Sequence, residues 1–300
     1  MNVRGRSGTR QRSAAACTAR GSSAVIGCSA RQRKEAPAVT GNTWTASGGE
    51  LADSYDRHGG TLRGALRHAL IARVVRAHLP LAPQRVLDVG GGGAQQALAL
   101  ARAGHHVTVL DPDPRMLQQA EARLAAEPEH VRNRVVLVAG TGERAADLVG
   151  GGFDAASCHG VLMYTADPLP LLAALVDAVR PGGMLSVATK QPALAMRPGL
   201  SGQWERALEL LDATAEVGNL RAATYARSVD ELSEVLDGLG AAVSAWYGVR
   251  IFTDHLGDAP VPEQEEFDRI LEAEWQAGCR DPYRRIARMI HLIAHRAVVV

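Results

Sequence analysis

The chain has 300 residues, of which 46% are hydrophobic, and its formal net charge is +1. This length allows one large domain, or one domain with additions, and the composition allows a sizeable core. Apolar runs are too short for a membrane span, which needs about 18 consecutive apolar residues. Residues 1–40 carry eight Lys or Arg and one acid, a charge of +7, so the remaining residues carry −6. A mildly acidic body argues against broad non-specific binding of nucleic acid but leaves room for a local basic patch.

The first part of the chain, residues 1–48, is rich in Arg, Ser, Ala and Gly and shows almost no hydrophobic periodicity. Such a segment cannot bury enough apolar surface to offset the entropy of ordering, so we predict a disordered extension followed by one domain over 49–300. The extension also lacks the apolar core of a secretory signal. The 4 cysteines form no CxxC pair and no cluster with histidine. We therefore expect reduced thiols, no metal site and a cytoplasmic protein.

The chain then alternates between predicted helices and strands. Leu, Ile and Val recur at helical spacing over 61–79, which predicts a helix before the first strand. Further helices are predicted at 94–103, 113–126 and 168–179. Strands are predicted at 85–89, 107–111, 134–139, 153–158 and 184–189. Repeated strand–helix units indicate a parallel sheet with right-handed crossovers and helices on both faces.

The second half of the chain interrupts this alternation. Residues 190–227 contain several Pro and Gly, and we predict a lid insertion over the carboxyl ends of the strands. Apolar runs at 241–252 and 289–299 are expected to pair antiparallel at the sheet edge. Helices are predicted near 203–216, 229–239 and 263–277. The expected fold is α/β, a doubly wound, seven-stranded, mostly parallel sheet of the Rossmann-like kind.

The most informative motif is the glycine-rich turn after the first predicted strand, which includes Gly90 and Gly91; Asp88, Gly90 and Gly92 form an acid-x-Gly-x-Gly pattern. Glycine lets the backbone approach a ligand, and the next helix directs its N-terminal N–H groups into the same space. A dinucleotide fingerprint, G-x-G-x-x-G, would need glycine where the chain has Gln95 or Gln96. An acid ahead of the first glycine suits a cationic ligand instead. The sulfonium and amino groups of S-adenosylmethionine are both positive, so this cofactor is favoured.

Four more residues follow predicted strands and are candidates for cofactor binding. Asp111 ends the second strand, and its carboxylate can accept both ribose hydroxyls; hydrogen bonds to a charged acceptor are worth roughly 1.5–3 kcal/mol each. Gly142 and Glu143 follow the third strand and could contact adenine through a backbone N–H and a carboxylate. His159 follows the fourth strand and is expected to face the cleft, although a lone histidine can equally be structural.

Several segments outside this core carry a resemblance to a known family. The chain resembles the bacterial tRNA 5-carboxymethoxyuridine methyltransferases, which are class I S-adenosylmethionine-dependent methyltransferases, from about Gly60 to Arg296. The strand and glycine turn over 85–92 are generic parts of the resemblance. The more specific parts are Arg63-Gly64-Ala65-Leu66-Arg67, Gly248-Val249-Arg250-Ile251-Phe252-Thr253-Asp254, Asp281-Pro282-Tyr283 and Ile290-His291.

The resemblance implies that the carboxylate of a modified wobble uridine in tRNA is converted to a methyl ester. It implies cofactor contacts from a set of residues that adds Arg67 for the methionine carboxylate. That set is Arg67, Gly90, Gly91, Asp111, Gly142, Glu143 and His159. Arg250, with Lys190 by its position after a strand, is a candidate for binding the acceptor carboxylate; Asp254 and Tyr283 are candidates for shaping the pocket. The acceptor is already ionised near pH 7, so no general base is expected.

The chain also departs from the family in two places. The polar stretch after the fifth strand is replaced by Lys190-Gln191-Pro192-Ala193, and the lysine-rich lid by Arg221 to Arg227 with fewer charges. Fewer cations weaken binding to a phosphate backbone. A methyltransferase that acts on a small-molecule metabolite is therefore an alternative. A nicotinamide-binding dehydrogenase, or a module that binds the cofactor without turnover, is a further alternative that cofactor titration and product detection would test.

Overall fold

The computed structural model describes residues 43–44, 55, 57–217 and 222–298. The chain divides into two units, Met1–Glu35 and Ala36–Val300, and every described residue belongs to the second. Most of the predicted disordered extension over 1–48 lies outside the described residues. Within it, Thr43 and Trp44 are described and contact the domain, which differs from the predicted disorder at these two positions.

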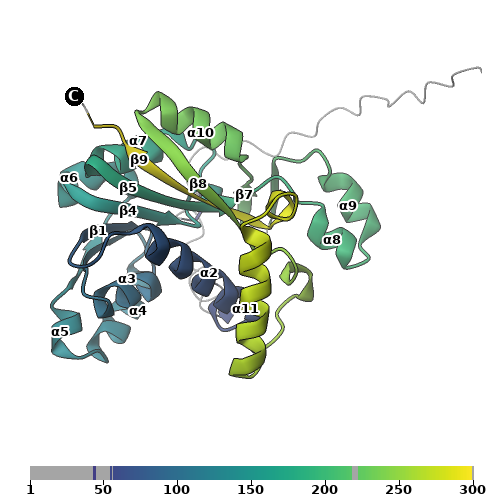
Figure 1. Ribbon diagram of the computed structural model, residues 1–300, viewed down its shortest axis with the longest axis horizontal. Coiled ribbons are helices and arrows are strands. Elements are labelled where there is room, and N and C mark those ends of the chain that lie inside the picture. Colours follow the sequence, from purple (N-terminus) through teal and green to yellow (C-terminus); the bar gives the residue numbers. More distant parts are fainter. Residues whose placement is uncertain (1–42, 45–54, 56, 218–221, 299–300) are drawn as a thin grey trace, which may run out of the picture. The chain divides into compact units, whose positions relative to one another are not determined.

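The core of the domain is a seven-stranded sheet with the order β3-β2-β1-β4-β5-β9-β8 (Figure 1). Strands β1 to β5 run parallel to one another, whereas β9 is antiparallel to both β5 and β8. The doubly wound, mostly parallel sheet predicted from the sequence is confirmed, including the antiparallel pair at its edge. The strands are β1 (Arg85–Val89), β2 (His106–Asp111), β3 (Val135–Ala139), β4 (Phe153–His159), β5 (Val179–Lys190), β8 (Ala241–Val249) and β9 (Met289–Arg296).

Helices cover both faces of this sheet (Figure 1). Leucines of α7 and α10 are buried on one face, and aliphatic residues of α2 and α3 are buried on the other, where Trp275 of α11 also packs. None of the helices in the described ranges is long and apolar enough to span a membrane. The helices are α2 (Leu62–His78), α3 (Gln95–Arg102), α4 (Pro114–Ala125), α5 (Glu129–Arg132), α6 (Ala145–Val149), α7 (Leu169–Ala178), α8 (Met196–Leu200), α9 (Trp204–Leu210), α10 (Val229–Gly238) and α11 (Gln264–Gly278).

Helix α2 matters for function because it carries two arginines of the site described below. It begins after Thr61, whose side-chain oxygen accepts a hydrogen bond from the Gly64 amide at 3.3 Å. Such an N-cap stabilises a helix by about 0.5–2 kcal/mol. Leu66, Leu70 and Val74 recur every four residues and are buried, so one face of the helix is fixed against the domain.

The insertion after β5 differs in detail from its prediction. Instead of one helix over 203–216, α9 ends at Leu210 and a short strand, β6 (Ala215–Val217), follows. It pairs antiparallel with β7 (Ala223–Tyr225), placing Glu216 opposite Thr224. The last residues of the predicted helix, Ala215 and Glu216, pair with Tyr225 and Thr224 instead, so cross-strand pairing outweighs the helical periodicity there. Strand β5 also begins earlier than predicted, because 181–183 lie within an irregular part of the strand rather than in a separate turn.

Candidate active site

The turn between β1 and α3 folds back tightly over the strand ends. Gly90 and Gly92 have positive φ values of 65° and 53°, and the Gly90 amide donates to the Leu110 carbonyl at 2.7 Å. A Cβ on Gly91 would lie 2.6 Å from Oδ2 of Asp88, which is too close for a side chain. Glycine is therefore required here both for the backbone angle and for the close approach to the carboxylate.

Asp88 lies beneath this turn and is almost completely buried, at 2% exposure. Its Oδ1 accepts a hydrogen bond from the Ser157 hydroxyl at 2.7 Å, whereas its Oδ2 has no hydrogen-bond partner among the described residues. Burial raises the pKa of Asp88 to about 6. A buried carboxylate with an open acceptor is costly unless a ligand compensates it, and a cation does so best.

Asp111 joins the turns after β1 and β2. Its two carboxylate oxygens accept the backbone amides of Gly92 and Asp113, both at 2.9 Å. Burial raises the pKa of Asp111 to about 6, and these two amide bonds oppose that shift. Each oxygen can accept a second hydrogen bond, so the position still suits a ribose. Asp113 caps α4 through the Arg115 amide, which leaves Asp111 without a capping role.

Gly142 and Glu143 lie where the third predicted strand ends. Gly142 is buried at the start of the short helix η2 (Gly142–Arg144), between the side chains of Leu171 and Val89. Glu143 is exposed at the surface. Gly142 is therefore packed against the core, and Glu143 is the one of the two whose side chain is open to a ligand.

His159 does not take the predicted orientation. We expected its ring to face the cleft, but Nε2 instead bonds the Ser186 hydroxyl at 2.9 Å, and that hydroxyl bonds Nε2 of His291 at 2.7 Å. The strand pairing of β4, β5 and β9 places these side chains side by side in a buried polar row. Only the backbone of His159 reaches the site, where its carbonyl accepts from Arg67 at 3.1 Å.

An aromatic cluster lies next to the cleft and was not predicted. The indole N–H of Trp44 donates to Oδ2 of Asp113 at 3.0 Å. Its ring makes edge contacts with the rings of Tyr164, at 5.3 Å, and Tyr55, at 5.8 Å. The Arg67 guanidinium lies 5.3 Å from the Tyr55 ring centre. These contacts connect the end of β2 to a second, strongly basic pocket.

This second pocket, called the cationic pocket below, is lined by side chains from α2, the end of β5, the insertion and the segments around β8 and β9. Its cations outnumber the one lining carboxylate, Asp254. The cationic pocket is lined by Arg63, Arg67, Lys190, Arg197, Arg250 and Arg288, together with Tyr55, His58, Met163, Tyr164, Ala222, Thr224, Asp254 and Met289. Three of the four predicted acceptor residues, Lys190, Arg250 and Asp254, are therefore brought together.

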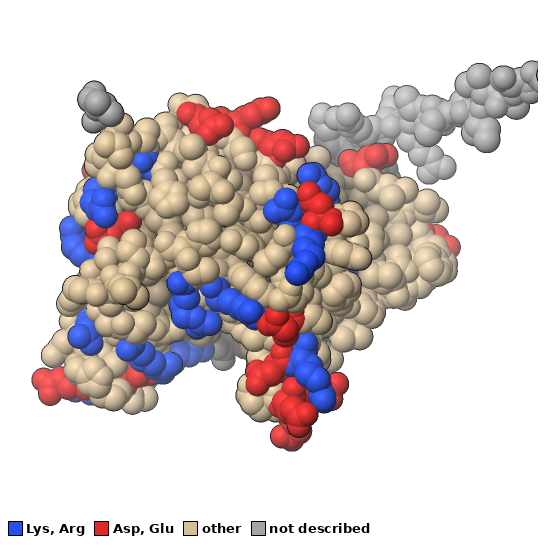
Figure 2. Space-filling view, in the orientation of Figure 1, with Lys and Arg blue, Asp and Glu red and all other residues tan. Residues whose placement is uncertain are grey.

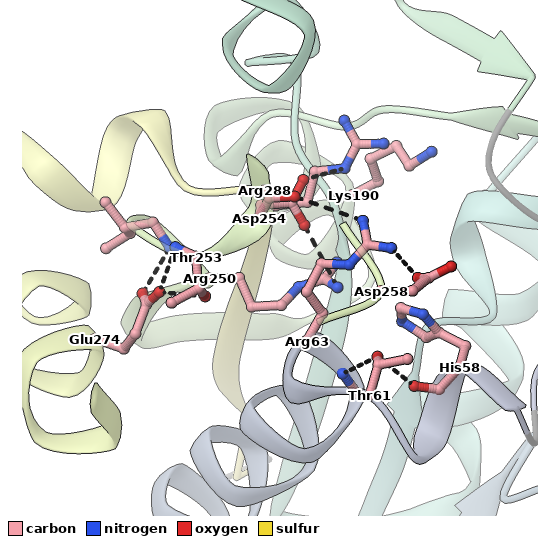
Figure 3. Close-up of polar contacts among 12 residues, drawn as sticks. His58, Thr61, Arg63, Lys190, Arg250, Thr253, Asp254, Asp258, Glu274 and Arg288 are labelled. Atoms are coloured by element: carbon pink, nitrogen blue, oxygen red, sulfur yellow. Dashed lines mark hydrogen bonds and ion pairs between the residues drawn. The ribbon is translucent and has the colours of Figure 1, made fainter. Parts of the chain in front are cut away.

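Asp254 lies between two arginines in this pocket (Figure 3). The Arg250 and Arg288 guanidinium groups are 3.5 and 3.6 Å from its two oxygens. Burial alone would raise the pKa of Asp254, but these guanidinium groups hold it below its usual value. The contacts are at ion-pair rather than hydrogen-bond distance. One carboxylate thus offsets the charge of two buried arginines while both keep donors for a ligand.

Lys190 is engaged by the insertion. Its Nζ donates to Glu216 at 2.9 Å and also to the Thr224 hydroxyl, so it contacts both strands of the β6–β7 hairpin. Arg288 pairs with the same Glu216 carboxylate. Burial, and then the charge of Arg288, lowers the pKa of Lys190 to about 8. Lys190 therefore lines the pocket as predicted, but its charge is already offset by a lid residue.

Tyr283 is not brought to the cationic pocket. It lies in the short helix η5 (Tyr283–Ile286) at 47% exposure, with its ring 6.5 Å from that of Phe252. The sequence motif that contains it therefore shapes the surface beside β8 rather than the pocket wall. Within the described ranges, no group of three or more His, Cys, Asp or Glu side chains could hold a metal ion.

Comparisons with known proteins agree with this geometry. Residues 87–185, from β1 into β5, match the family model described as a methyltransferase domain. Over 252 residues the chain is 27% identical to the tRNA 5-carboxymethoxyuridine methyltransferase of Escherichia coli K12, a match that covers 82% of this chain and 95% of the relative. The chain therefore carries a methyltransferase domain on a sheet of the class I order and is an enzyme that uses S-adenosylmethionine. The family resemblance seen in the sequence is confirmed as a similarity over most of its length.

Two further proteins show how far the likeness extends. This chain is 36% identical over 115 residues to the ubiquinone biosynthesis O-methyltransferase of Xanthomonas campestris pv. campestris. The match covers 38% of this chain and 46% of that relative. Its fold matches the magnesium protoporphyrin IX methyltransferase of Synechocystis PCC 6803 with a TM-score of 0.57 at 14% identity, over 85% of this chain and all of the other.

The cleft of the methyltransferase fits S-adenosylmethionine. The unpartnered buried oxygen of Asp88 supplies negative charge, Asp111 supplies acceptors at the end of β2, and the glycine turn packs against the Asp88 carboxylate more closely than a residue with a Cβ could. When bound, the cofactor supplies an electrophilic methyl group on a sulfonium. Arg67 contacts the β4 end through the His159 carbonyl and also lines the cationic pocket, so it lies between the two sites.

Sequence reasoning missed several residues of the cationic pocket. Arg63 lies one helical turn before Arg67, so their spacing in a predicted helix could have placed both on one face. Arg63 pairs with Asp258 and donates to the Asp254 carbonyl at 3.5 Å (Figure 3). Arg288 and Glu216 meet only through the folded insertion, and no local spacing indicates their pairing.

Proposed function

We propose that this methyltransferase esterifies a carboxylate, namely that of 5-carboxymethoxyuridine at the wobble position of tRNA. The observation that carries the proposal is the cationic pocket at the ends of β4 and β5, next to the cofactor cleft. The relative that is similar over 82% of the chain is named for this acceptor. The predicted cofactor and acceptor residues are proposed to act in these two adjoining sites.

The charge of the cationic pocket supports an anionic acceptor. Arg250 is 93% buried, and burial lowers the pKa of its guanidinium to about 10. Burying several cations with few acids is costly, because desolvation removes their hydration without a full set of partners. A carboxylate that enters the pocket would offset this cost. We therefore assign Arg250 to the acceptor carboxylate, with Asp254 holding the guanidinium in place.

Transfer of the methyl group to a carboxylate requires alignment of the two reactants rather than proton transfer. A carboxylate is ionised near pH 7 and can attack the methyl group directly. The residues of the two sites hold acceptor and donor in line and exclude water, and alignment of this kind is worth up to about 7–11 kcal/mol. Arg67 is assigned to the methionine carboxylate, on the cofactor side, and Arg250 to the acceptor side.

The proposed acceptor can be tested directly. Purified protein is incubated with S-adenosylmethionine and tRNA from a strain that lacks its own enzyme of this type, and the nucleosides are analysed by mass spectrometry. We expect the methyl ester of 5-carboxymethoxyuridine to appear at the wobble position. If the tRNA profile is unchanged while the cofactor still binds, the proposed acceptor is wrong.

A second candidate, a small-molecule metabolite with a carboxylate, is favoured by the surface of the insertion. Its exposed described residues include several large apolar side chains but no Lys or Arg, and α9 carries Glu205 and Glu209 against Arg206. On the face drawn in Figure 2, Lys and Arg form small groups interspersed with acids rather than a continuous stripe. Phosphate backbones need such a stripe for affinity. The exposed apolar residues of the insertion are Leu200, Trp204, Leu208, Leu211 and Val217.

Salt dependence separates the two candidates. Binding of tRNA releases counterions, so its apparent affinity falls steeply as salt concentration rises, whereas a small carboxylate shows a shallow dependence. A metabolite extract from a deletion strain, incubated with the protein and methyl-labelled cofactor, would reveal a labelled small ester. Such an ester together with an unchanged tRNA profile would favour the second candidate.

A further inference from the structure

We propose that Glu274 is a positioning residue, which fixes the loop that carries Arg250 and Asp254 and so sets the affinity of the cationic pocket for anions. The inference rests on the proposed function in one respect, because it takes this pocket to be the acceptor site. Glu274 lies on α11, outside the region that matches the methyltransferase family model. It lines neither the cofactor cleft nor the cationic pocket.

Glu274 is completely buried and accepts hydrogen bonds from one short segment of chain. Its Oε2 accepts the Ile251 amide at 2.6 Å, and its Oε1 accepts the Phe252 and Thr253 amides, both at 3.0 Å. The Thr253 hydroxyl donates to the same Oε1 at 2.7 Å (Figure 3). Three consecutive amides thus converge on one carboxylate, and no ion pair with Glu274 is present among the described residues.

This segment is the link between the two pocket residues that flank it. Arg250 precedes the three amides and has a positive φ of 61°, a conformation that side chains other than glycine rarely adopt. Asp254 follows them and pairs with Arg250 and Arg288. The Arg288 amide donates to the Arg250 carbonyl at 2.9 Å, which fixes the start of the segment. Between Arg250 and Asp254 the segment makes no regular strand or helix, and among the described residues its three amides bond only to Glu274. Figure 3 shows Glu274 on one side of the loop and the arginines on the other.

Helix α11 is itself held firmly enough to act as a support. Its last residue, Gly278, packs so closely on the Gly248 carbonyl of β8 that a Cβ there would clash. The Trp275 ring stacks on Tyr247 with centres 5.5 Å apart. Arg73 of α2 lies 4.4 Å from the Trp275 ring centre, so α11 also contacts the helix that supplies two pocket arginines. The position of Glu274 is therefore set by the sheet and by α2 together.

The substitution Glu274→Gln tests this arrangement with little change of shape. The side-chain amide keeps one acceptor oxygen but turns a second acceptor into a donor that faces backbone N–H groups. Thr253→Val is a milder second variant, because it removes only the hydroxyl donor. Glu266→Gln is the matched control, since Glu266 is exposed on the same helix.

The first measurement is amide hydrogen exchange over 251–253. We expect Glu274→Gln to reduce protection there by about tenfold or more, Thr253→Val to reduce it less, and Glu266→Gln to leave it unchanged. Unchanged protection in Glu274→Gln would overturn the proposal, because the carboxylate would then not hold the loop.

The second measurement separates positioning from stability alone. Inorganic phosphate serves as an anion probe in calorimetric titrations, and S-adenosylmethionine is titrated in parallel. We expect Glu274→Gln to weaken phosphate binding, and to raise the acceptor KM, by about tenfold while the cofactor Kd stays unchanged. Lost amide protection with unchanged phosphate affinity and acceptor KM would overturn the proposal, as would a wild-type protein that binds no phosphate.

Failure of the proposed acceptor and failure of the proposed role of Glu274 give different results. If wild-type protein leaves tRNA unmethylated but Glu274→Gln still weakens phosphate binding, the proposed acceptor is wrong and the role of Glu274 holds. If tRNA is methylated equally well by wild type and Glu274→Gln, the proposed function holds and the role of Glu274 fails.

Discussion

Two buried carboxylates, Asp88 and Asp111, lie at the ends of neighbouring strands and define the chemistry of the cofactor cleft. Burial raises the pKa of each to about 6, although hydrogen bonds from Ser157 and from backbone amides oppose the shift. In the free protein their ionised forms are therefore less favourable than in water. A cationic ligand reverses this, because it stabilises the charged carboxylates that it meets.

This raised pKa predicts a pH dependence of cofactor binding. Asp88 and Asp111 lose their charge as pH falls through about 6, whereas S-adenosylmethionine stays positive. We expect the cofactor Kd to rise by up to about tenfold per pH unit below that point for each group that must be ionised. Calorimetry between about pH 7.5 and about pH 5 measures the effect. Asp111→Asn should flatten the curve, and a Kd that is constant in the wild type would contradict the prediction.

Substitutions of Arg67 and Arg250 are expected to affect different binding constants, that of the cofactor and that of the acceptor. Arg67 contacts the end of β4 and Arg250 contacts Asp254 in the cationic pocket. We expect Arg67→Met to raise the cofactor Kd, and Arg250→Ala to raise the acceptor KM with an unchanged cofactor Kd, each by about tenfold or more. Arg250→Lys keeps the charge and should lie in between. An unchanged KM in Arg250→Ala would remove this residue from acceptor binding.

At the scale of elements, the β6–β7 hairpin is held over the cationic pocket mainly by one carboxylate. Glu216 pairs with Lys190 and with Arg288, and all three side chains are at most 8% exposed. Thr224 of the opposite strand accepts from the same Lys190. The hairpin is short, so these contacts rather than its own ladder keep it in place.

A matched pair of substitutions tests this attachment. Glu216→Ala leaves two buried cations without their partner, and breaking a buried pair of this kind costs about 3–5 kcal/mol. Glu209→Ala removes an exposed pair with Arg206 on the neighbouring helix, which is worth only about 0.2–1 kcal/mol. We expect a clear fall in Tm and faster proteolysis within 211–227 for Glu216→Ala alone. Equal Tm values for the two variants would show that Glu216 does not hold the hairpin.

Helices and strands were easier to predict from the sequence than the contacts between them, for a physical reason. The strands of the sheet are short apolar runs followed by turn residues, so their ends could be located from neighbouring residues alone. The glycine turn, Asp88 and Asp111 lie at those ends and were placed correctly beside one another. The lid was not resolved in advance, because the pairing of β6 with β7 depends on residues on both sides of a turn.

Side-chain direction and long-range pairing were the parts that could not be predicted. The ring of His159 turns into the sheet because Ser186 and His291, from two other strands, offer it hydrogen bonds there. Tyr283 belongs to a motif shared with the family, yet it lies at the surface beside Phe252. Glu274 accepts from residues more than twenty positions away, a contact that no spacing rule reveals.

At the scale of the whole molecule, buried histidines dominate the response to acid. Burial lowers the pKa of His58 to about 4 and those of His68 and His291 to about 3. These rings are neutral when folded but take up protons when unfolded below about pH 6.5, so their contribution to stability is lost as pH falls. Asp88 and Asp111 act in the opposite sense between about pH 6 and 3.8, because the folded state binds their protons first.

The balance between these histidines and the two carboxyl groups predicts that acid destabilises the folded protein. Four buried histidines, His58, His68, His159 and His291, take up protons on unfolding, whereas Asp88 and Asp111 are protonated first in the folded state, so unfolding takes up protons between about pH 6 and 4. We expect the free energy of unfolding to fall as the pH falls through this range. Urea titrations across this pH range measure it. His291→Asn should reduce the slope, and a stability that rises on acidification would contradict the assignment.

The contact between Trp44 and Asp113 also gives the molecule a natural optical reporter. Indole emission depends on the charge and polarity around the ring. This indole bonds Asp113, whose amide bonds Asp111, the carboxylate proposed for the ribose. The chain has only three other tryptophans, and they belong to the insertion, β8 and α11. Occupancy of the cleft should therefore change the fluorescence of the unlabelled protein, and the change should vanish in Trp44→Phe.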